Sequence, residues 1–387
     1  MSATAPSTII EARLHVLRAA TRDGVAMSFA PLTHRSMVLV ELETADGRIG
    51  YGESWTNYPS WATVERVATL REGVFPLVIG QDSRRITELQ RRLVVELTPI
   101  GRQWGAPGPI MQAISAVDIA LWDLHGRACE RSIGSLVGGR IRESSPLYAS
   151  SLGPEGVVRQ GRHCLAEGYT AVKVKLGFGR EHDERILVEA REALGADVAL
   201  YADANQAWGV DEAVAMAPLL AEYDVAWLEE PLRGNRLDEL EELHRRTGLV
   251  IATGENLYGR EEFRRFAASP AVAILQPDIA KTGGFTEALA ICQLAEAHRK
   301  PVMPHLYGGA IAFAATLQLA ACAPAVHAIE YDIRDNPLRD PLLIDGPRPH
   351  LGRIILPDGP GLGVDLDLHA AQRHLEPAPH SEEELTA

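Results

Sequence analysis

Polar residues recur at nearly constant spacing through the second half of the chain, each at the end of a short apolar run. Successive members lie 23 to 28 residues apart, which is the length of one strand followed by one helix. Short apolar strands that alternate with amphipathic helices are typical of parallel βαβ units. The pattern therefore predicts a parallel α/β fold with polar groups gathered at one end of its strands. The series consists of Lys175, Asp203, Glu229, Glu255, Asp278, His305 and Glu330.

Eight strands fit this pattern. No Gly-rich phosphate-binding turn follows the first of them, so a closed (β/α)8-type barrel is favoured over an open doubly wound sheet. The active site of such a barrel lies at the carboxyl ends of its strands, where the polar series falls. We place the strands at 147–150, 171–176, 199–203, 225–229, 249–254, 273–277, 301–305 and 326–331.

The first 140 residues follow a different pattern, which predicts an α+β domain. Residues 36–53 form two alternating runs around an Asp46-Gly47 turn and, with Ile9 to Arg18, predict a small antiparallel sheet. Helical patterns follow at 61–79, 83–98 and 109–129. We predict this domain at 1–140, the barrel at 141–335, and a Pro- and Gly-rich segment at 336–387 that packs back on the first domain. Disorder is expected only in the last ten or so residues.

Composition restricts the partners and the compartment. A net charge of −14 argues against a sequence-independent grip on nucleic acid or on an anionic membrane. The four cysteines are far apart and form no CxxC motif, and the N-terminus lacks the apolar region of a signal peptide. The apolar stretch 308–328 contains Gln318, Pro324 and His327, which favours a buried helix over a membrane span. We therefore expect a cytoplasmic protein without a nucleic-acid or membrane partner.

Three consecutive units end in carboxylates, at Asp203, Glu229-Glu230 and Glu255. Neighbouring barrel strands bring these groups together, and three unneutralised charges would repel strongly, so we expect a bound cation. Ligation by oxygen alone points to Mg²⁺, with Mn²⁺ as the alternative, rather than to zinc. Glu229 and Glu230 point to opposite faces of their strand, so only one of them can be a ligand.

The remaining strand ends offer bases. Lys173 and Lys175 face the same side of one strand, and two adjacent ammonium groups lower each other's pKa, which makes a basic lysine available. His305 and Asp278 end adjacent strands, which suits an Asp that fixes the imidazole tautomer. Glu330 is expected to be a carboxylic acid that stays protonated and donates a hydrogen bond to a developing oxyanion.

These motifs resemble one family over nearly the whole chain. They are KxK at 173–175, DAN at 203–205, EEP at 229–231, GEN at 254–256, PD followed by GG, PH at 304–305 and the GPGLG tail. The chain resembles the enolase superfamily and, within it, the mandelate racemase subgroup. The muconate lactonizing subgroup fits less well, because it has lysine where this chain has Asp278. We expect Lys281 to lie outside the catalytic set.

The resemblance implies that the first domain, completed by the C-terminal segment, caps a modified barrel, and that Glu229 rather than Glu230 binds Mg²⁺. It places substrate specificity in capping loops near 21–35 and 55–58. Asn205, Trp55 and Tyr58 are the candidate substrate contacts. Further capping-loop candidates are Arg22, His34, Arg35, Asn57 and Trp104.

The expected activity is Mg²⁺-dependent removal of the proton next to a substrate carboxylate, through an enediolate. Lys175 and His305 would act on opposite faces of that carbon, while Lys173 and Glu330 contact the carboxylate. Dehydration of a sugar acid to a 2-keto-3-deoxy acid is the first choice, because a KxK motif with a His-Asp dyad is common among acid-sugar dehydratases.

Three other outcomes stay open. Racemisation or epimerisation of a 2-hydroxy acid needs the same two bases, and the segments EYDIRDNPLRDP and PHLYGG also resemble the sugar-lactone cycloisomerases. An inactive metal-binding barrel is the non-enzymatic alternative. A barrel metallohydrolase is disfavoured because the sequence has no HxH pair. The expected partner is a small carboxylate, and relatives often form homo-oligomers.

Overall fold

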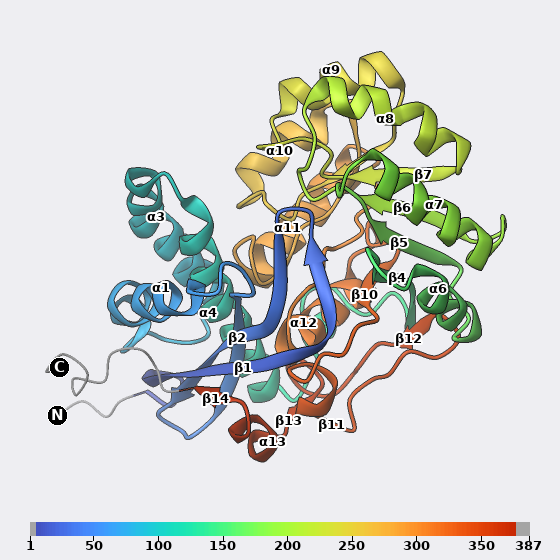
Figure 1. The fold of residues 1–387 in the computed structure, drawn as a ribbon. Helices are drawn as coiled ribbons and strands as arrows, with labels where there is room; N and C mark the ends of the chain where they lie inside the picture. Colours follow the sequence, from blue (N-terminus) through green and yellow to red (C-terminus); the bar gives the residue numbers. More distant parts are fainter. Residues whose placement is uncertain (1–4, 377–387) are drawn as a thin grey trace, which may run out of the picture.

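The computed structural model describes residues 5–376, so the disorder predicted for the last ten residues lies outside the described part. Two large sheets organise the chain (Figure 1). The first is a four-stranded antiparallel sheet in the order β14-β1-β2-β3, and the second is a closed parallel barrel. The strands of the first sheet are β1 (Ile9–Met27), β2 (Ala30–Thr44), β3 (Ile49–Trp55) and β14 (Leu375–Glu376).

The β1–β2 hairpin is much longer than the sequence predicted. We expected a capping loop over 21–35, but β1 and β2 stay paired as far as Met27 and Ala30, with a register shift between Ala20 and Val25. The arm crosses toward the barrel (Figure 1), where Ser28 Oγ at its tip donates a hydrogen bond of 2.9 Å to the Asn205 carbonyl. The loop prediction was wrong because a two-stranded ribbon satisfies the backbone groups of this segment.

Helices cover one face of the antiparallel sheet, close to their predicted positions. Helix α4 lies directly against β3, and Gly52 permits this approach because a Cβ there would stand 1.7 Å from the Ala116 carbonyl oxygen. The predicted helix at 61–79 is divided by a π-helical turn, η1. The helices are α1 (Ala62–Ala68), η1 (Thr69–Val74), α2 (Phe75–Val78), α3 (Ile86–Trp104), α4 (Pro107–Ala128) and the short α5 (Ile133–Leu136).

The predicted (β/α)8-type barrel is confirmed. Parallel pairing runs continuously from the first barrel strand to the sixth, and the last strand pairs with the first to close the circle. The seventh position, predicted at 301–305, is irregular, because Val302 bridges Leu275 and Val326 without extended pairing. The strands are β4 (Ser144–Leu152), β5 (Ala171–Lys175), β6 (Ala199–Asp203), β7 (Val225–Glu229), β8 (Ile251–Thr253), β9 (Val272–Leu275) and β10 (Ile329–Asp332).

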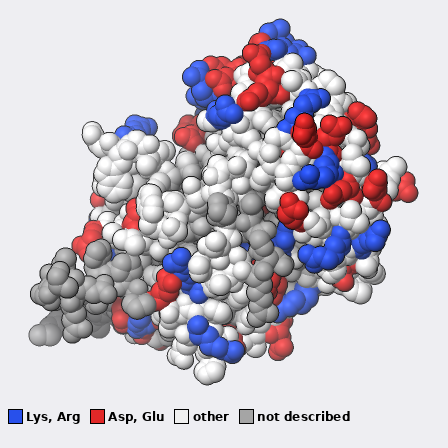
Figure 2. Space-filling model, viewed as in Figure 1, with Lys and Arg blue, Asp and Glu red and all other residues white. Residues whose placement is uncertain are grey.

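Helices form the outer layer of the barrel (Figure 1). The apolar stretch 308–328, for which the sequence favoured a buried helix over a membrane span, contains the buried 13-residue helix α12. Within residues 5–376 no helix is both long and apolar enough to cross a membrane. On the face shown in Figure 2, basic and acidic side chains are interspersed over the outer helices rather than gathered in one basic patch. The helices are α6 (Val157–Ala166), α7 (Arg180–Leu194), α8 (Val210–Glu222), α9 (Leu237–Thr247), α10 (Arg260–Ala268), α11 (Gly284–Ala297) and α12 (Ala310–Cys322).

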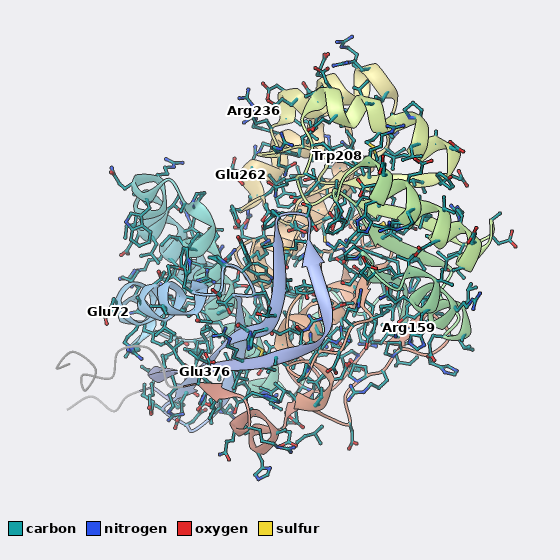
Figure 3. All side chains as sticks on the ribbon, viewed as in Figure 1. Glu72, Arg159, Trp208, Arg236, Glu262 and Glu376 are labelled. Carbon is teal, nitrogen blue, oxygen red and sulfur yellow. The ribbon has the colours of Figure 1, made fainter. Side chains whose placement is uncertain are left out.

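The C-terminal segment leads from the barrel back to the first sheet. Strand β12 pairs with β4 of the barrel, and β14 pairs with β1, so that Leu375 lies opposite Leu17. Figure 3 shows Glu376 beside the antiparallel sheet. The boundaries at 140 and 335 stay a prediction. Between the two pairings lie η2 (Asp340–Leu342), β11 (Leu343–Ile344), β12 (Arg353–Ile355), β13 (Asp365–Leu366) and α13 (Leu368–Gln372).

Candidate active site

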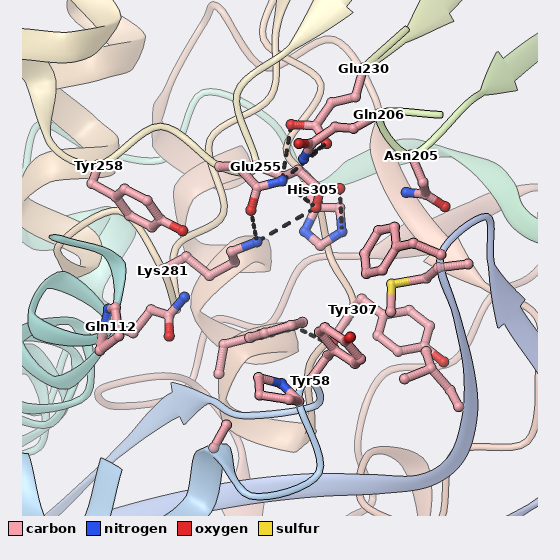
Figure 4. A pocket seen from close by; sticks show the side chains of 18 of the residues that line it. Tyr58, Gln112, Asn205, Gln206, Glu230, Glu255, Tyr258, Lys281, His305 and Tyr307 are labelled. Carbon is pink, nitrogen blue, oxygen red and sulfur yellow. Dashed lines mark hydrogen bonds and ion pairs between the residues drawn. The ribbon is translucent and has the colours of Figure 1, made fainter. Parts of the chain in front are cut away.

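A cavity of about 330 Å³ lies between the carboxyl ends of the barrel strands and the N-terminal cap (Figure 4). Lysine, histidine and carboxylate side chains from the barrel form its floor, and the β1–β2 arm, the loop after β3 and helix α1 form its cover. Predicted site residues that line it are Lys175, Asn205, Glu255, His305, Glu330, Trp55 and Tyr58.

The three predicted metal ligands come together at the carboxyl ends of their strands, with Glu255 in the cavity floor and Asp203 and Glu229 buried. Asp203 and Glu229 end adjacent strands in register, and Glu255 follows β8. One carboxylate oxygen from each of the three lies within 4.8 Å of the others. Glu229 Oε1 is buried and has no hydrogen-bond partner among the described residues. An oxygen-only donor set with a vacant buried oxygen fits a hard divalent cation such as Mg²⁺.

Two lysines face this carboxylate group. Lys175 Nζ lies 2.5 Å from Asp203 Oδ2, and Lys173 Nζ lies 2.7 Å from Glu229 Oε2 and 2.8 Å from Glu330 Oε1. Burial has the largest effect on the pKa of Lys175 and lowers it, as Lys173 does, but the carboxylates of Asp203, Glu229 and Glu255 together outweigh them and raise it. We expected a lowered pKa for Lys175, and that expectation fails because the carboxylates together act more strongly than burial and the second ammonium.

His305 is held between two carboxylates. Its Nδ1 lies 2.7 Å from Asp278 Oδ2, which is the predicted dyad, and its Nε2 lies 3.1 Å from Glu255 Oε2. Burial would lower the pKa of His305, but Glu255 and Asp278 raise it to about 9. Asp278 thus fixes the tautomer while Nε2 faces the cavity floor.

Glu330 is ionised rather than protonated, which corrects the sequence expectation. Burial has the largest effect and would raise its pKa, but Lys173, His305 and the Ser150 hydroxyl together outweigh burial and lower the pKa to about 2. The carboxylate also accepts hydrogen bonds from Ser150 Oγ and, at 3.1 Å, from the Leu306 backbone N–H. Glu330 therefore orients Lys173 as an acceptor and does not serve as a donor here.

Lys281, which we expect to lie outside the catalytic set, lines the cavity wall. Its side chain is 2% exposed, and Nζ lies 3.0 Å from Asn256 Oδ1, 3.5 Å from Glu255 Oε1 and 4.6 Å from the centre of the Trp55 ring. Lys281 belongs to the buried run Ile279 to Thr282, and no pattern in the sequence indicated that its side chain would line the cavity. Glu230 lies beside it, where Asn256 and Gln206 bind its carboxylate.

The predicted substrate contacts and capping-loop residues lie in different places. Tyr58 and Trp55 line the cavity, as predicted for substrate contacts. Arg35 is instead buried in an ion pair with Asp332 of the barrel. Asn205 lines the cavity and donates from Nδ2 to Asp203 Oδ2 at 3.2 Å. His34 and Trp104 are not among the cavity-lining residues, and the side chain of Arg22 lies outside the described part.

Alternate residues at the end of β3 hold the loop that carries His305. Trp55 Nε1 and Asn57 Nδ2 donate to the Tyr307 carbonyl at 3.2 and 2.7 Å. Glu53 accepts from the Gly309 backbone N–H at 2.6 Å and from the first turn of α12. Spacing by two places the three side chains on one face of the strand. We call Glu53, Trp55 and Asn57 the β3 clasp.

Comparisons with known proteins agree with this geometry. The chain matches the family model "Mandelate racemase / muconate lactonizing enzyme, N-terminal domain" over residues 8–138 and "Enolase C-terminal domain-like" over residues 156–371. It is 33% identical to D-galactarolactone cycloisomerase of Agrobacterium fabrum, covering 96% of this chain and 100% of that protein. It is 31% identical to arabinonate dehydratase of Saccharolobus solfataricus, covering 89% and 92%.

A solved structure of a racemase from Streptomyces coelicolor with bound magnesium superposes with a TM-score of 0.84 at 27% identity, covering 95% of this chain and 100% of that one. The named relatives are thus lyases and isomerases. Since both family models and a full-length relative match, the chain is an enzyme that belongs to the mandelate racemase / muconate lactonizing enzyme family of the enolase superfamily.

Proposed function

We propose that this enzyme removes the proton α to the carboxylate of a sugar acid or sugar-acid lactone, with Mg²⁺ as its cofactor. The observation that carries the proposal is the group of three carboxylates, two of them buried, between Lys175 on one side and the His305–Asp278 pair on the other. Two relatives are named for a sugar acid or a sugar-acid lactone, arabinonate dehydratase and D-galactarolactone cycloisomerase, which supports a substrate of this class.

Asp203, Glu229 and Glu255 would hold the cation. When bound, it supplies positive charge that stabilises the second negative charge developing on the substrate carboxylate as the proton leaves. Lys173 lies within 3 Å of Glu229 and Glu330, so its ammonium is fixed to bind the same carboxylate.

Lys175 and His305 move the proton. Lys175 Nζ and His305 Nε2 come from strand positions two and seven of the barrel, on either side of the metal-ligand strands. Each can take a proton from the α-carbon or return one to it. His305 keeps the required tautomer through Nδ1 and Asp278, while Asn205, which lies beside Asp203 in the cavity lining, would contact a substrate hydroxyl.

Two bases permit dehydration, in which one takes the α-proton and the other protonates the departing β-hydroxyl. We keep dehydration to a 2-keto-3-deoxy acid as the first candidate, supported by the arabinonate dehydratase relative. Cycloisomerisation of a sugar lactone is the second candidate, favoured by the relative that aligns over its full length.

Exchange in D2O tests the proposal. The enzyme with Mg²⁺ is incubated with a panel of aldonates, aldarates and their lactones, and ¹H NMR follows loss of the α-proton signal or formation of a keto acid. We expect exchange or product with at least one acid, abolished in Lys175→Met or His305→Asn. If the wild type gives neither with any acid, the proposal fails. Exchange that survives in both variants refutes the residue roles.

We also propose a cytoplasmic, homo-oligomeric enzyme whose partner is this small carboxylate. The four cysteines at 129, 164, 292 and 322 are free, which supports a reducing compartment. Gel filtration with light scattering measures the oligomeric state.

A further inference from the structure

The two carboxylate oxygens of Glu229 have different surroundings. Oε2 accepts hydrogen bonds from Gln276 Nε2 at 2.6 Å and from Lys173 Nζ at 2.7 Å. Oε1 is buried and has no hydrogen-bond partner among residues 5–376. Because Oε2 is already engaged by two donors, Oε1 is the oxygen that Glu229 can offer to a cation.

Gln276 is held firmly enough to orient a carboxylate. It follows β9 directly, its side chain is fully buried, and its backbone N–H donates to the Thr253 carbonyl at 2.9 Å. Gly254 lies against the same backbone, since a Cβ on Gly254 would stand 2.8 Å from the Gln276 nitrogen. Gln276 therefore contacts Glu229 through its side chain and the segment that leads to Glu255 through its backbone.

The two donors to Glu229 Oε2 differ in charge. Lys173 brings an ammonium, which also bonds Glu330 at 2.8 Å and which repels a cation bound nearby. The amide of Gln276 is neutral, so it fixes the carboxylate without weakening the attraction of that carboxylate for a cation. The amide nitrogen rather than the amide oxygen must face Glu229, because a carboxylate oxygen can only accept.

We propose that Gln276 is the positioning residue of the metal site, holding Glu229 so that this ligand offers one oxygen, Oε1, to the cation. The inference rests on the proposed function and adds a residue to its metal site. Mg²⁺ demands near-ideal octahedral geometry, whereas Ca²⁺ takes monodentate or bidentate carboxylates in a flexible shell. A Glu229 that is restricted to one oxygen in one orientation therefore favours Mg²⁺ over Ca²⁺.

Calorimetry tests the proposal on the protein freed of metal by chelation, without substrate, by measuring the affinities for Mg²⁺ and for Ca²⁺. Gln276→Met keeps the length of the side chain but removes the donor. Loss of a group that orients a metal ligand typically costs about 10- to 100-fold in metal affinity, and we expect the Mg²⁺ affinity to fall by this factor. The Ca²⁺ affinity should fall by less than about threefold, because a flexible shell tolerates a displaced carboxylate.

Thr253→Val is the matched control. Thr253 is fully buried at the end of β8, and its Oγ1 donates to Asn235 Oδ1 at 3.0 Å. The variant therefore also loses one buried hydrogen bond at this end of the barrel, but that bond involves none of the metal ligands. Its melting temperature should fall while its Mg²⁺ affinity stays that of the wild type.

Gln276→Asn keeps the test decisive if the Met variant does not fold, because its amide is one methylene too short to reach Glu229. A wild-type Mg²⁺ affinity in a folded Gln276 variant refutes the positioning role, as does an equal loss in Thr253→Val. An equal loss for Mg²⁺ and Ca²⁺ refutes the selection of Mg²⁺. These results leave the proposed function standing. If the wild type itself binds no Mg²⁺, the cofactor of the proposed function is wrong and the inference fails with it.

Discussion

Asn57→Asp tests whether the β3 clasp positions His305. Asn57 is 8% exposed; its Nδ2 donates to the Tyr307 carbonyl at 2.7 Å and its Oδ1 accepts from the Ser36 N–H at 2.9 Å. The isosteric carboxylate keeps the Ser36 bond but turns a donor into an acceptor that faces a carbonyl oxygen. Loss of a buried hydrogen bond of this kind costs about 1 to 3 kcal/mol, and the loop two residues beyond His305 must move to relieve it.

Displacing a catalytic base by about 1 Å slows proton transfer about 100-fold. We therefore expect a loss of about this size in exchange of the α-proton that faces His305. The assay is α-proton exchange in D2O with both α-epimers of an active acid. The epimer that loses exchange in His305→Asn is the one whose α-proton faces His305. The epimer that loses exchange in Lys175→Met is the one whose α-proton faces Lys175. Asn57→Asp should slow the first while changing the second by less than about threefold.

Asp118→Asn is the matched control. Asp118 is a buried cap carboxylate that accepts from the Thr286 N–H and hydroxyl at the start of α11, so its loss also loosens cap from barrel. It should lower thermal stability without changing the ratio of the two faces. A ratio that shifts equally in both variants, or in neither, would refute positioning by the clasp.

Three further predictions follow from charge and packing. Burial would lower the His305 pKa, but Glu255, Asp278 and Glu330 together raise it to about 9. Mg²⁺ binding at Glu255 should therefore release protons, and the Mg²⁺ affinity should rise with pH up to about 9. Calorimetry in buffers of different ionisation enthalpy measures this, and a pH-independent affinity contradicts it. Burial raises the Glu53 pKa from 4.5 to about 7, so the folded state binds a proton that the unfolded chain releases, and stability from this group falls as pH rises from 4.5 to 7. Glu53→Gln should flatten that slope in urea unfolding across pH, and an unchanged slope would exclude Glu53 as its source. Gly52→Ala sets a Cβ 1.7 Å from the Ala116 carbonyl and should cost more than the roughly 1 to 3 kcal/mol typical of overpacking, whereas an unchanged urea midpoint would show that β3 and α4 separate freely.

The strand-end residues were predictable because a barrel imposes one register on all its strands. Asp203 and Glu229 each follow an apolar run of fixed length, and adjacent parallel strands must bring such positions level. The same regularity predicted β6 and β7 at their observed bounds. The His305–Asp278 contact followed from the same reasoning.

Features that depend on distant neighbours were not predictable. The ionisation of Glu330 is set by Lys173, which lies 157 positions earlier in the chain and 2.8 Å away in space. Lys281 belongs to an irregular loop, so no periodicity indicates where its side chain points. The long hairpin arm was missed because its strands pair only with each other over their outer part, and because the resemblance implied a capping loop near 21–35.

The pairing of β14 with β1 has a consequence for how the enzyme is made. The strand that completes the Leu17 side of the sheet is synthesised 358 residues after Leu17, later than every barrel strand. Domains generally fold as their chain emerges, but here the cap keeps an unfinished edge until β14 has been made. A nascent barrel can close its strands while its cover is still incomplete. Truncation before residue 375 should therefore delay or prevent maturation of the enzyme even though no catalytic group is lost.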